Sequence, residues 1–302
     1  MCTSFTYQSS DHHHFFARTM DFPTTTTWQP LAIAAGSTYP TGLGTTRTGT
    51  LAWFGGGRHP QTTTTNLMAD GINSTGLVCA ELTLPQVAHY AATPVVGHIN
   101  LTPQAFINWV LSEHTSLAQV IADLSLVTLI DRPWVDHQPV SPFHWLLTDS
   151  TGMTVVIEPT GGPLHAIANP SGILTNTPVL ATHLANLNQL VGLTGDAFTP
   201  QTQLAIQAYC QTHAVLPTGT IPTTRFLHTA LRRWGRAPQT ASNTIPTLLN
   251  WLDEVSLPVD ATKQQRPYHH DTHYQSIIDL TNQTYYFRDQ KTRQLQVFQL
   301  CH

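Results

Sequence analysis

The sequence predicts an α+β protein with strands at both ends of the chain and helices between them. Near the start, residues 3–8 and 14–20 form two runs that flank a Ser-Ser-Asp turn, so we expect a β-hairpin there. Near the end, residues 273–300 predict antiparallel strands joined by turns at 282–283 and 291–292. Segments within 106–124 and 199–255 place apolar residues at helical spacing, which indicates paired helices.

The composition argues against several classes of partner. The 302 residues are 41% hydrophobic but only 10% charged, and the formal net charge is −4. Because no basic block occurs, we do not expect nucleic acid as a partner. No apolar run reaches the roughly eighteen residues that a membrane-spanning helix needs, so we expect no membrane span.

Cysteine usage and the first residues bear on the compartment. The four cysteines, Cys2, Cys79, Cys210 and Cys301, form no CxxC motif and are expected to be free thiols. The first residues lack a basic segment followed by an apolar core, so they do not resemble a signal peptide. We therefore expect a cytoplasmic enzyme. Since neither a linker nor an internal repeat occurs, we expect one domain over residues 1–302.

The interior of the chain divides into further elements. Thr102 and Pro103 predict a helix start, and Ser116 predicts the N-cap of a second helix. In the segment 70–77, Gly71 and Gly76 indicate a tight turn with unusual backbone angles. Strands are expected at 31–35, 77–84, 143–148, 153–158 and 164–168, and helices at 199–213, 222–234 and 245–255.

Position 2 holds the residue with the most distinctive chemistry. Removal of the initiator methionine, which a small side chain at position 2 permits, gives Cys2 a free α-amino group beside its thiol. Such an amine, with an unperturbed pKa of about 7.7–8.0, takes a proton near neutral pH while the thiolate attacks a carbonyl. The hairpin returns Arg18 and Asp21 towards Cys2. There we expect Arg18 to stabilise the thiolate and Asp21 to orient the amine.

Motifs along the whole chain support this interpretation. They are Met-Cys-Thr followed by Ala-Arg-Thr-Met-Asp-Phe (17–22), Asp-Gly-Ile-Asn-Ser-Thr-Gly-Leu (70–77), Gly-Ile-Leu-Thr-Asn-Thr-Pro (172–178) and Thr-Arg-Phe (224–226). Together they resemble the choloylglycine hydrolase family, which contains conjugated bile salt hydrolases and penicillin V acylases. The resemblance implies the four-layer αββα sandwich of N-terminal-nucleophile hydrolases and a homotetramer. It also implies that Cys2, Arg18, Asp21, Asn176 and Arg225 lie in the catalytic centre.

The hypothesis that follows is hydrolysis of a linear, non-peptide amide of small-molecule size. The Cys2 thiolate attacks the acyl carbonyl, and the Cys2 amine transfers protons. The resemblance assigns the side-chain amide of Asn176 to the oxyanion hole, together with a backbone N–H near Thr83. Water then hydrolyses the thioester. Histidine-rich stretches at 12–14 and 269–273 lack a structural-zinc spacing, and Gly55–Gly57 lacks a phosphate-binding pattern. We therefore expect neither a metal nor a cofactor.

The substrate class rests on fewer residues. Residues 18–22 and 157–159 are similar to penicillin V acylases, whereas Trp145 and residues 183–188 are similar to bile salt hydrolases. At Thr83, bile salt hydrolases typically carry Asn and penicillin V acylases carry Tyr. We favour a penicillin V acylase-like amidase. Conjugated bile salts and N-acyl homoserine lactones are the alternative substrates, and an inactive binding member of the fold is the alternative from another class.

Overall fold

Two β-sheets lie face to face in the computed structural model, which describes residues 2–22, 27–59, 66–133, 140–258 and 270–300. The first sheet has the order β15 (Ile173–Thr175), β1 (Thr3–Gln8), β2 (His14–Phe22), β16 (Asp271–Asp279), β17 (Thr284–Asp289) and β18 (Leu295–Gln299). The second has the order β14 (Ile167–Ala168), β13 (Thr154–Ile157), β12 (Phe143–Thr148), β9 (Val78–Thr83), β8 (Asp70–Asn73), β6 (Trp53–Arg58) and β3 (Gln29–Ile33), with β7 (Leu67–Met68) paired to β6.

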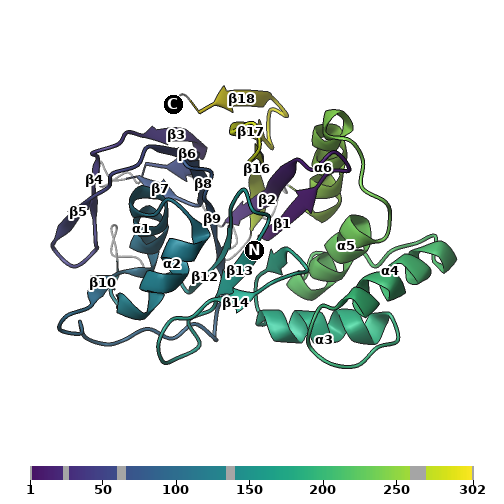
Figure 1. Cartoon of the computed structure of the whole chain (residues 1–302), viewed down its shortest axis with the longest axis horizontal. Coiled ribbons are helices and arrows are strands. Elements are labelled where there is room, and N and C mark those ends of the chain that lie inside the picture. The colour runs from purple at the N-terminus through teal and green to yellow at the C-terminus, as the bar shows by residue number, and fades with distance from the viewer. Residues whose placement is uncertain (1, 23–26, 60–65, 134–139, 259–269, 301–302) are drawn as a thin grey trace.

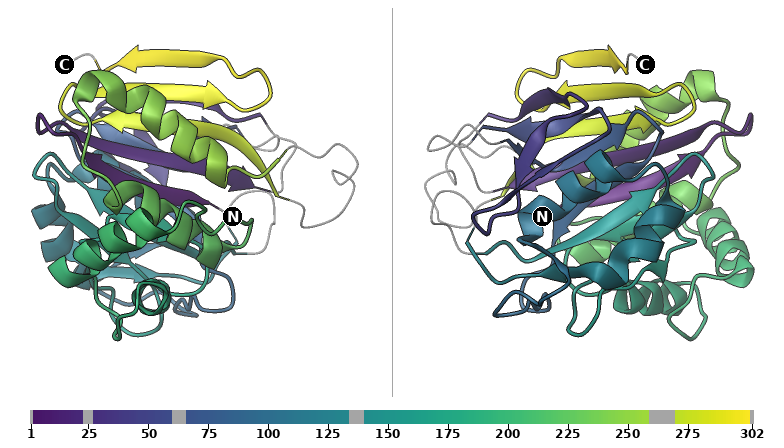
Figure 2. Two further views of the ribbon diagram at one scale, coloured as in Figure 1. Left: turned by 90° about the vertical axis from the view of Figure 1, so that its right-hand side faces the viewer. Right: turned by 60° about the vertical axis from the view of Figure 1, so that its left-hand side comes forward.

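Helices cover the outer face of each sheet (Figures 1 and 2). On the second sheet, α1 (Phe106–Glu113) contacts β8 and β9, and α2 (Leu117–Asp123) follows it in the chain. On the first sheet, α5 (Pro222–Trp234) contacts β1 and β15, and α6 (Ala241–Val255) contacts β2 and β16. The helices α3 (Leu180–Leu190) and α4 (Pro200–Thr212) pack against α5. The arrangement is the four-layer αββα sandwich that the family resemblance implies.

Two pairs of short strands and two 3₁₀ turns complete the described fold. Strand β4 (Thr38–Pro40) pairs with β5 (Thr46–Thr48), and β10 (Ile99–Leu101) runs parallel to β11 (Val127–Leu129). The 3₁₀ turns η1 (Pro103–Ala105) and η2 (Leu124–Leu126) precede α1 and follow α2. Within the described ranges, no helix is both long and apolar enough to cross a membrane.

The N-terminal hairpin is a central part of the first sheet. Its two strands pair in antiparallel register, with Ser4 opposite Arg18, and β2 also pairs with β16 from the far end of the chain. Both strands are buried on both faces, because helices cover one face and the second sheet covers the other. The prediction of one domain over 1–302 is favoured by this pairing of the two ends and stays a prediction.

Local sequence signals succeed where the partner is near in the chain. The Ser116 hydroxyl accepts a hydrogen bond from the Gln119 N–H and caps α2 as predicted, and α5 spans Pro222–Trp234 as predicted. The predicted strand at 164–168 is reduced to β14. Helix α6 begins at Ala241, four residues before the predicted start, because its first N–H is capped by the distant Asp11 carboxylate. Cys2, Cys79 and Cys210 are free thiols, and Cys301 lies outside the described residues.

The helical segment begins where predicted, with Thr102 at the N-cap position and Pro103 first in the 3₁₀ turn. The Thr102 hydroxyl makes no capping bond, because it donates to the Thr41 carbonyl. The expectation for the turn at 70–77 is corrected at one of its two glycines. Gly76 has the expected positive φ of 88°, whereas Gly71 lies in strand β8 with ordinary backbone angles. Glycine is needed at 71 for closeness, since a Cβ there would lie 2.8 Å from the Phe54 carbonyl oxygen.

Candidate active site

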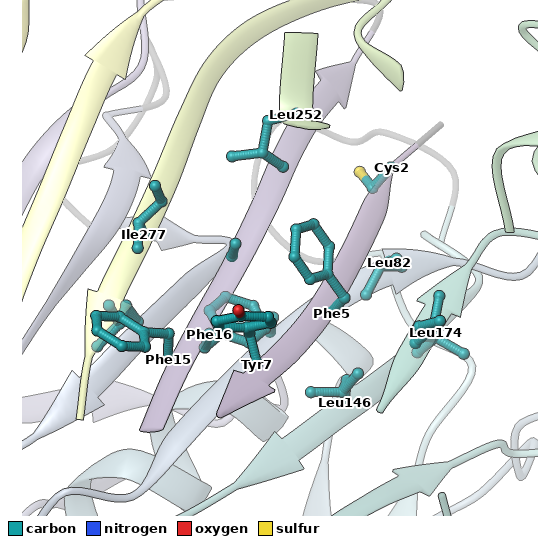
Figure 3. Packing of buried hydrophobic residues seen from close by; sticks show 14 of the residues in the cluster. Cys2, Phe5, Tyr7, Phe15, Phe16, Leu82, Leu146, Leu174, Leu252 and Ile277 are labelled. Atoms are coloured by element: carbon teal, nitrogen blue, oxygen red, sulfur yellow. The ribbon is translucent and has the colours of Figure 1, made fainter. Parts of the chain in front are cut away.

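Cys2 lies at the start of β1, where the hairpin register sets it opposite Met20. Its thiol sulfur is 4.0 Å from the Met20 sulfur and 3.7 Å from the Asp21 carbonyl oxygen. The side chain is 3% exposed and borders the apolar cluster to which Phe5 and Tyr7 of the same strand belong (Figure 3). The backbone nitrogen of Cys2 donates to Oδ1 of Asn176. The sulfur and the backbone nitrogen of Cys2 therefore contact different residues.

Arg18 reaches from β2 towards the second sheet and is fully buried. Its guanidinium donates to the backbone carbonyls of Ala69 and Glu81, the latter at 3.1 Å. Burial alone would lower the pKa of this guanidinium, but the Cys2 thiol, Tyr274 and Asp70 around it hold that pKa above its usual value. Arg18 is thus a fixed positive charge beside the thiol, where it would favour the thiolate.

Asp21 points to the other face of β2, towards the helices. Its Oδ2 accepts a 2.7 Å hydrogen bond from Nη1 of Arg225, and its Oδ1 accepts one of 2.6 Å from the Thr272 hydroxyl. Arg225 also donates from Nε to the Thr3 hydroxyl at 2.9 Å. Both ionic side chains have no exposed surface, so each compensates the buried charge of the other. We expected Asp21 to orient the Cys2 amine. The hydrogen bonds described above connect the Asp21 carboxylate to Arg225 and Thr272.

Asn176 follows β15 and joins Cys2 to the second sheet. Its Nδ2 donates to the carbonyl oxygen and to the hydroxyl of Thr83, each at 2.8 Å, while its Oδ1 faces the Cys2 nitrogen. The amide to which the resemblance assigns an oxyanion role is therefore bonded to Thr83. One of these acceptors is a side-chain hydroxyl, which a substrate oxygen can replace.

The Thr83 N–H has the direction that an oxyanion hole needs. Thr83 pairs with Phe143 of β12, yet the Phe143 N–H donates to the Tyr90 hydroxyl at 2.7 Å. The next pair along is hydrogen-bonded, from the Leu84 N–H to the Pro142 carbonyl. Because bonded and non-bonded pairs alternate in antiparallel ladders, the Thr83 N–H points away from β12. It points to the side on which Asn176 meets the Thr83 carbonyl.

His183 contacts the backbone of Asn176, a role that the sequence did not indicate. Its Nε2 lies 2.8 Å from the Asn176 carbonyl oxygen and 3.1 Å from the Thr175 hydroxyl. Its ring stacks on Phe226, the neighbour of Arg225. Burial lowers the pKa of His183 to about 4, so the ring is neutral near pH 7. The contact with Asn176, seven residues earlier in the chain, identifies the role of His183, and no sequence motif shows that contact.

The site brings together five sequence-predicted residues from four segments. Cys2, Arg18, Asp21, Asn176 and Arg225 are all buried, and contacts connect each of them to the hairpin. The arrangement places a cation beside the Cys2 thiol, an amide beside the Cys2 nitrogen and the buried Asp21–Arg225 ion pair on the other face of β2. In the described part of the chain, no three His, Cys, Asp or Glu side chains are grouped so as to hold a metal ion.

The buried neutral state of His183 predicts a pH dependence of stability. The folded-state pKa of about 4 lies below the unfolded value of about 6.5, so the unfolded chain binds the extra proton between these values. The free energy of unfolding should therefore fall as the pH is lowered from about 6.5 towards 4. In urea unfolding across this pH range, the free energy of unfolding should fall less steeply for His183→Gln than for the wild type. The exposed His165→Gln control should show the same fall as the wild type. Equal slopes in wild type and His183→Gln would contradict the assignment.

Comparison with known proteins agrees with the geometry. The bile salt hydrolase/transferase of Clostridium perfringens is 30% identical over 233 residues, covering 75% of this chain and 70% of that protein. The protein of the same name from Lactiplantibacillus plantarum is 25% identical over 309 residues, covering 100% of this chain and 93% of that protein.

Two solved structures share the fold. The C2A mutant of the conjugated bile acid hydrolase from Clostridium perfringens superposes with a TM-score of 0.81 at 25% identity, covering 99% of this chain and 92% of that one. The penicillin V acylase from Agrobacterium tumefaciens superposes with a TM-score of 0.72 at 18% identity, covering 99% and 86%. The model of the linear amide C-N hydrolases, choloylglycine hydrolase family, matches residues 2–302. The chain belongs to this family and is a linear amide C-N hydrolase.

Proposed function

We propose that Cys2 is the nucleophile of an N-terminal-nucleophile amidase and that the reaction passes through a thioester. The observation that carries the proposal is the double environment of Cys2. Its sulfur lies beside the fixed positive charge of Arg18, and its nitrogen lies against the Asn176 amide. A nearby cation favours the thiolate, and a hydrogen-bond acceptor orients the amine that takes the thiol proton.

The proposed reaction has two stages, acylation of Cys2 and hydrolysis of the thioester. After removal of Met1, the Cys2 amine takes the thiol proton, and the thiolate forms a C–S bond to the substrate carbonyl. The tetrahedral intermediate collapses, the C–N bond breaks, and the ammonium group gives its proton to the leaving nitrogen. Water then attacks the thioester with the amine as base, the C–S bond breaks, and the acid is released. Asn176 Oδ1 orients the amine through both steps by accepting one of its hydrogens.

The oxyanion is stabilised by Asn176 and Thr83 in this proposal. The substrate oxygen displaces the Thr83 hydroxyl from Nδ2 of Asn176 and accepts a second hydrogen bond from the Thr83 N–H. Displacement exchanges one 2.8 Å hydrogen bond for another to a more negative oxygen. His183 holds the Asn176 backbone so that the amide keeps its place.

The first candidate substrate class is the penicillin V type of acyl amide. It is supported by the penicillin V acylase-like residues 18–22 and 157–159. Position 83 favours neither class, because Thr83 is neither the Asn of bile salt hydrolases nor the Tyr of penicillin V acylases. A second candidate, conjugated bile salts, is favoured by the two relatives, both of which are named as bile salt hydrolase/transferases.

Amine release from penicillin V, glycocholate and taurocholate, compared as kcat/KM, tests both substrate and nucleophile. We expect penicillin V to be cleaved most efficiently, and we expect Cys2→Ala to abolish release. Cys210→Ala, which removes a thiol between α4 and α5, should keep wild-type rates. Preference for the bile salts would select the second candidate. Activity of Cys2→Ala near wild type would disprove the mechanism. No release from any of the three by a wild type that lacks Met1 would point to another acyl amide, such as an N-acyl homoserine lactone, or to an inactive binding member of the fold.

If Asn176 and the Thr83 N–H hold the oxyanion, alanine substitutions at these two contacting residues should have different effects on kcat. Asn176→Ala removes a donor and should lower kcat by about 10²–10³-fold. Thr83→Ala removes the hydroxyl but keeps the backbone N–H, so kcat should stay close to that of the wild type. The measurement is kcat for the best substrate from the parallel assay. If Thr83→Ala loses as much as Asn176→Ala, the hydroxyl and not the backbone is the second donor.

A further inference from the structure

Asp70 is a buried carboxylate that the mechanism above does not use. It begins β8 of the second sheet, but its side chain reaches the first sheet, where hydroxyl groups surround it. Its Oδ2 accepts from the Tyr274 hydroxyl and its Oδ1 from the Tyr285 hydroxyl, each at 2.6 Å. The Ser276 hydroxyl and the Gly56 N–H donate at 3.4 and 3.3 Å. Asp70, both tyrosines and Ser276 have no exposed surface.

The fifth neighbour of Asp70 is Arg18. Nη1 of Arg18 lies 3.5 Å from Oδ2 of Asp70, and both side chains have no exposed surface. The Arg18 guanidinium also donates to two backbone carbonyls of the second sheet and lies 3.2 Å from the Met20 sulfur. The two backbone carbonyls and the carboxylate fix the guanidinium from the second sheet, while the Cys2 thiol is another of its neighbours.

The tyrosines fix the carboxylate in turn. A phenol that donates to a buried carboxylate keeps its proton, and burial together with the Asp70 charge raises the pKa of Tyr274 and Tyr285 well above the usual value. Space around this contact is tight, because a Cβ on Gly56 would lie 2.3 Å from the Tyr274 hydroxyl oxygen. Asp70 therefore has a single position, set by two strands of the opposite sheet.

We infer that Asp70 is a positioning residue: it holds Arg18 against Cys2 and thereby sets the reactivity of the nucleophile without touching the substrate. The other carboxyl that interacts with Arg18 from the second sheet is Glu81, and burial raises the pKa of Glu81 well above its usual range. Asp70 is the carboxylate in contact with the guanidinium, and a long side chain held by a carboxylate keeps one orientation. The inference rests on the proposed role of Cys2. It adds to that role a chain of contacts from Tyr285 through Asp70 and Arg18 to the thiol.

The test is the pH dependence of Cys2 alkylation by iodoacetamide, measured without substrate from the mass of the Cys2 peptide. Two effects of Asp70→Asn have opposite signs, so the direction of the change is decisive. If Asp70 positions Arg18, its loss releases the guanidinium, and the apparent thiol midpoint should rise by about one unit or more. If Asp70 acts only as a nearby negative charge, its loss should lower the midpoint, which would overturn the inference. An unchanged midpoint would also overturn it.

A double-mutant cycle separates positioning from general damage. In an Arg18→Leu background only the direct charge of Asp70 can act on the thiol, so Asp70→Asn should no longer raise the midpoint. A rise there as large as in the wild-type background would contradict the inference. Asp253→Asn is the matched control, since this carboxylate binds Arg288 and Arg293 near α6, and it should leave the midpoint unchanged. A shift in the control as large as in Asp70→Asn would likewise count against positioning.

A milder variant keeps the inference testable if Asp70→Asn fails to fold. Tyr285→Phe removes one phenol donor and keeps the Arg18–Asp70 pair. We expect a smaller rise of the midpoint in the same direction and a lower kcat with KM unchanged. An unchanged midpoint in Tyr285→Phe would overturn the chain of contacts. The outcome for the proposed function is separate, because it depends on Cys2→Ala in the turnover assay.

Discussion

The compensation of buried charge around β2 is the constraint on which the site depends. Arg18 and Arg225 have no exposed surface, and an isolated buried cation is strongly unfavourable. Each therefore lies beside a carboxylate, Asp70 on the side of the second sheet and Asp21 on the side of the helices. The two pairs lie on opposite faces of one strand, so the cysteine at the end of the neighbouring strand is held between them.

The register of the hairpin makes this separation possible. Side chains alternate along β2, so Arg18 and Met20 face the second sheet while Thr19 and Asp21 face the helices. A slip of one residue would exchange the two faces and bring Ala17 or Thr19 into the place of Arg18. The pairing of Ser4 with Arg18, and of Arg18 with Ser276 in β16, fixes the register from both sides. Catalytic geometry and fold therefore depend on the same hydrogen-bond ladders.

Much of the site could be predicted because its residues belong to local motifs. Cys2, Arg18 and Asp21 lie in one hairpin, and Arg225 belongs to the Thr-Arg-Phe motif in the first turn of α5. The contacts that join residues from distant motifs could not be predicted in this way. Asp70 meets Tyr285 across 215 residues, and Asn176 meets Thr83 across 93. No periodicity or spacing reports such contacts, because they arise only when the two sheets pack.

The same distinction explains the boundaries that were wrong. Helix α2 begins where its own serine caps it, whereas α6 begins where Asp11 of the hairpin turn caps it. Thr102 has the residue type of a cap but donates to Thr41, because that carbonyl is nearby in the fold. Residue type predicts what a side chain can do, and the packed neighbours decide which of these options it takes.

If Cys2, freed of Met1, carries the acyl group during turnover, the acyl-enzyme can be trapped. Acid quenching during steady-state hydrolysis of penicillin V, followed by intact-mass measurement, detects it. We expect a chain that lacks Met1 and carries one phenoxyacetyl group, which maps to the Cys2 peptide and is absent from Cys2→Ala. A chain that turns substrate over while it retains Met1, or an acyl group on another residue, would show that Cys2 is not the nucleophile.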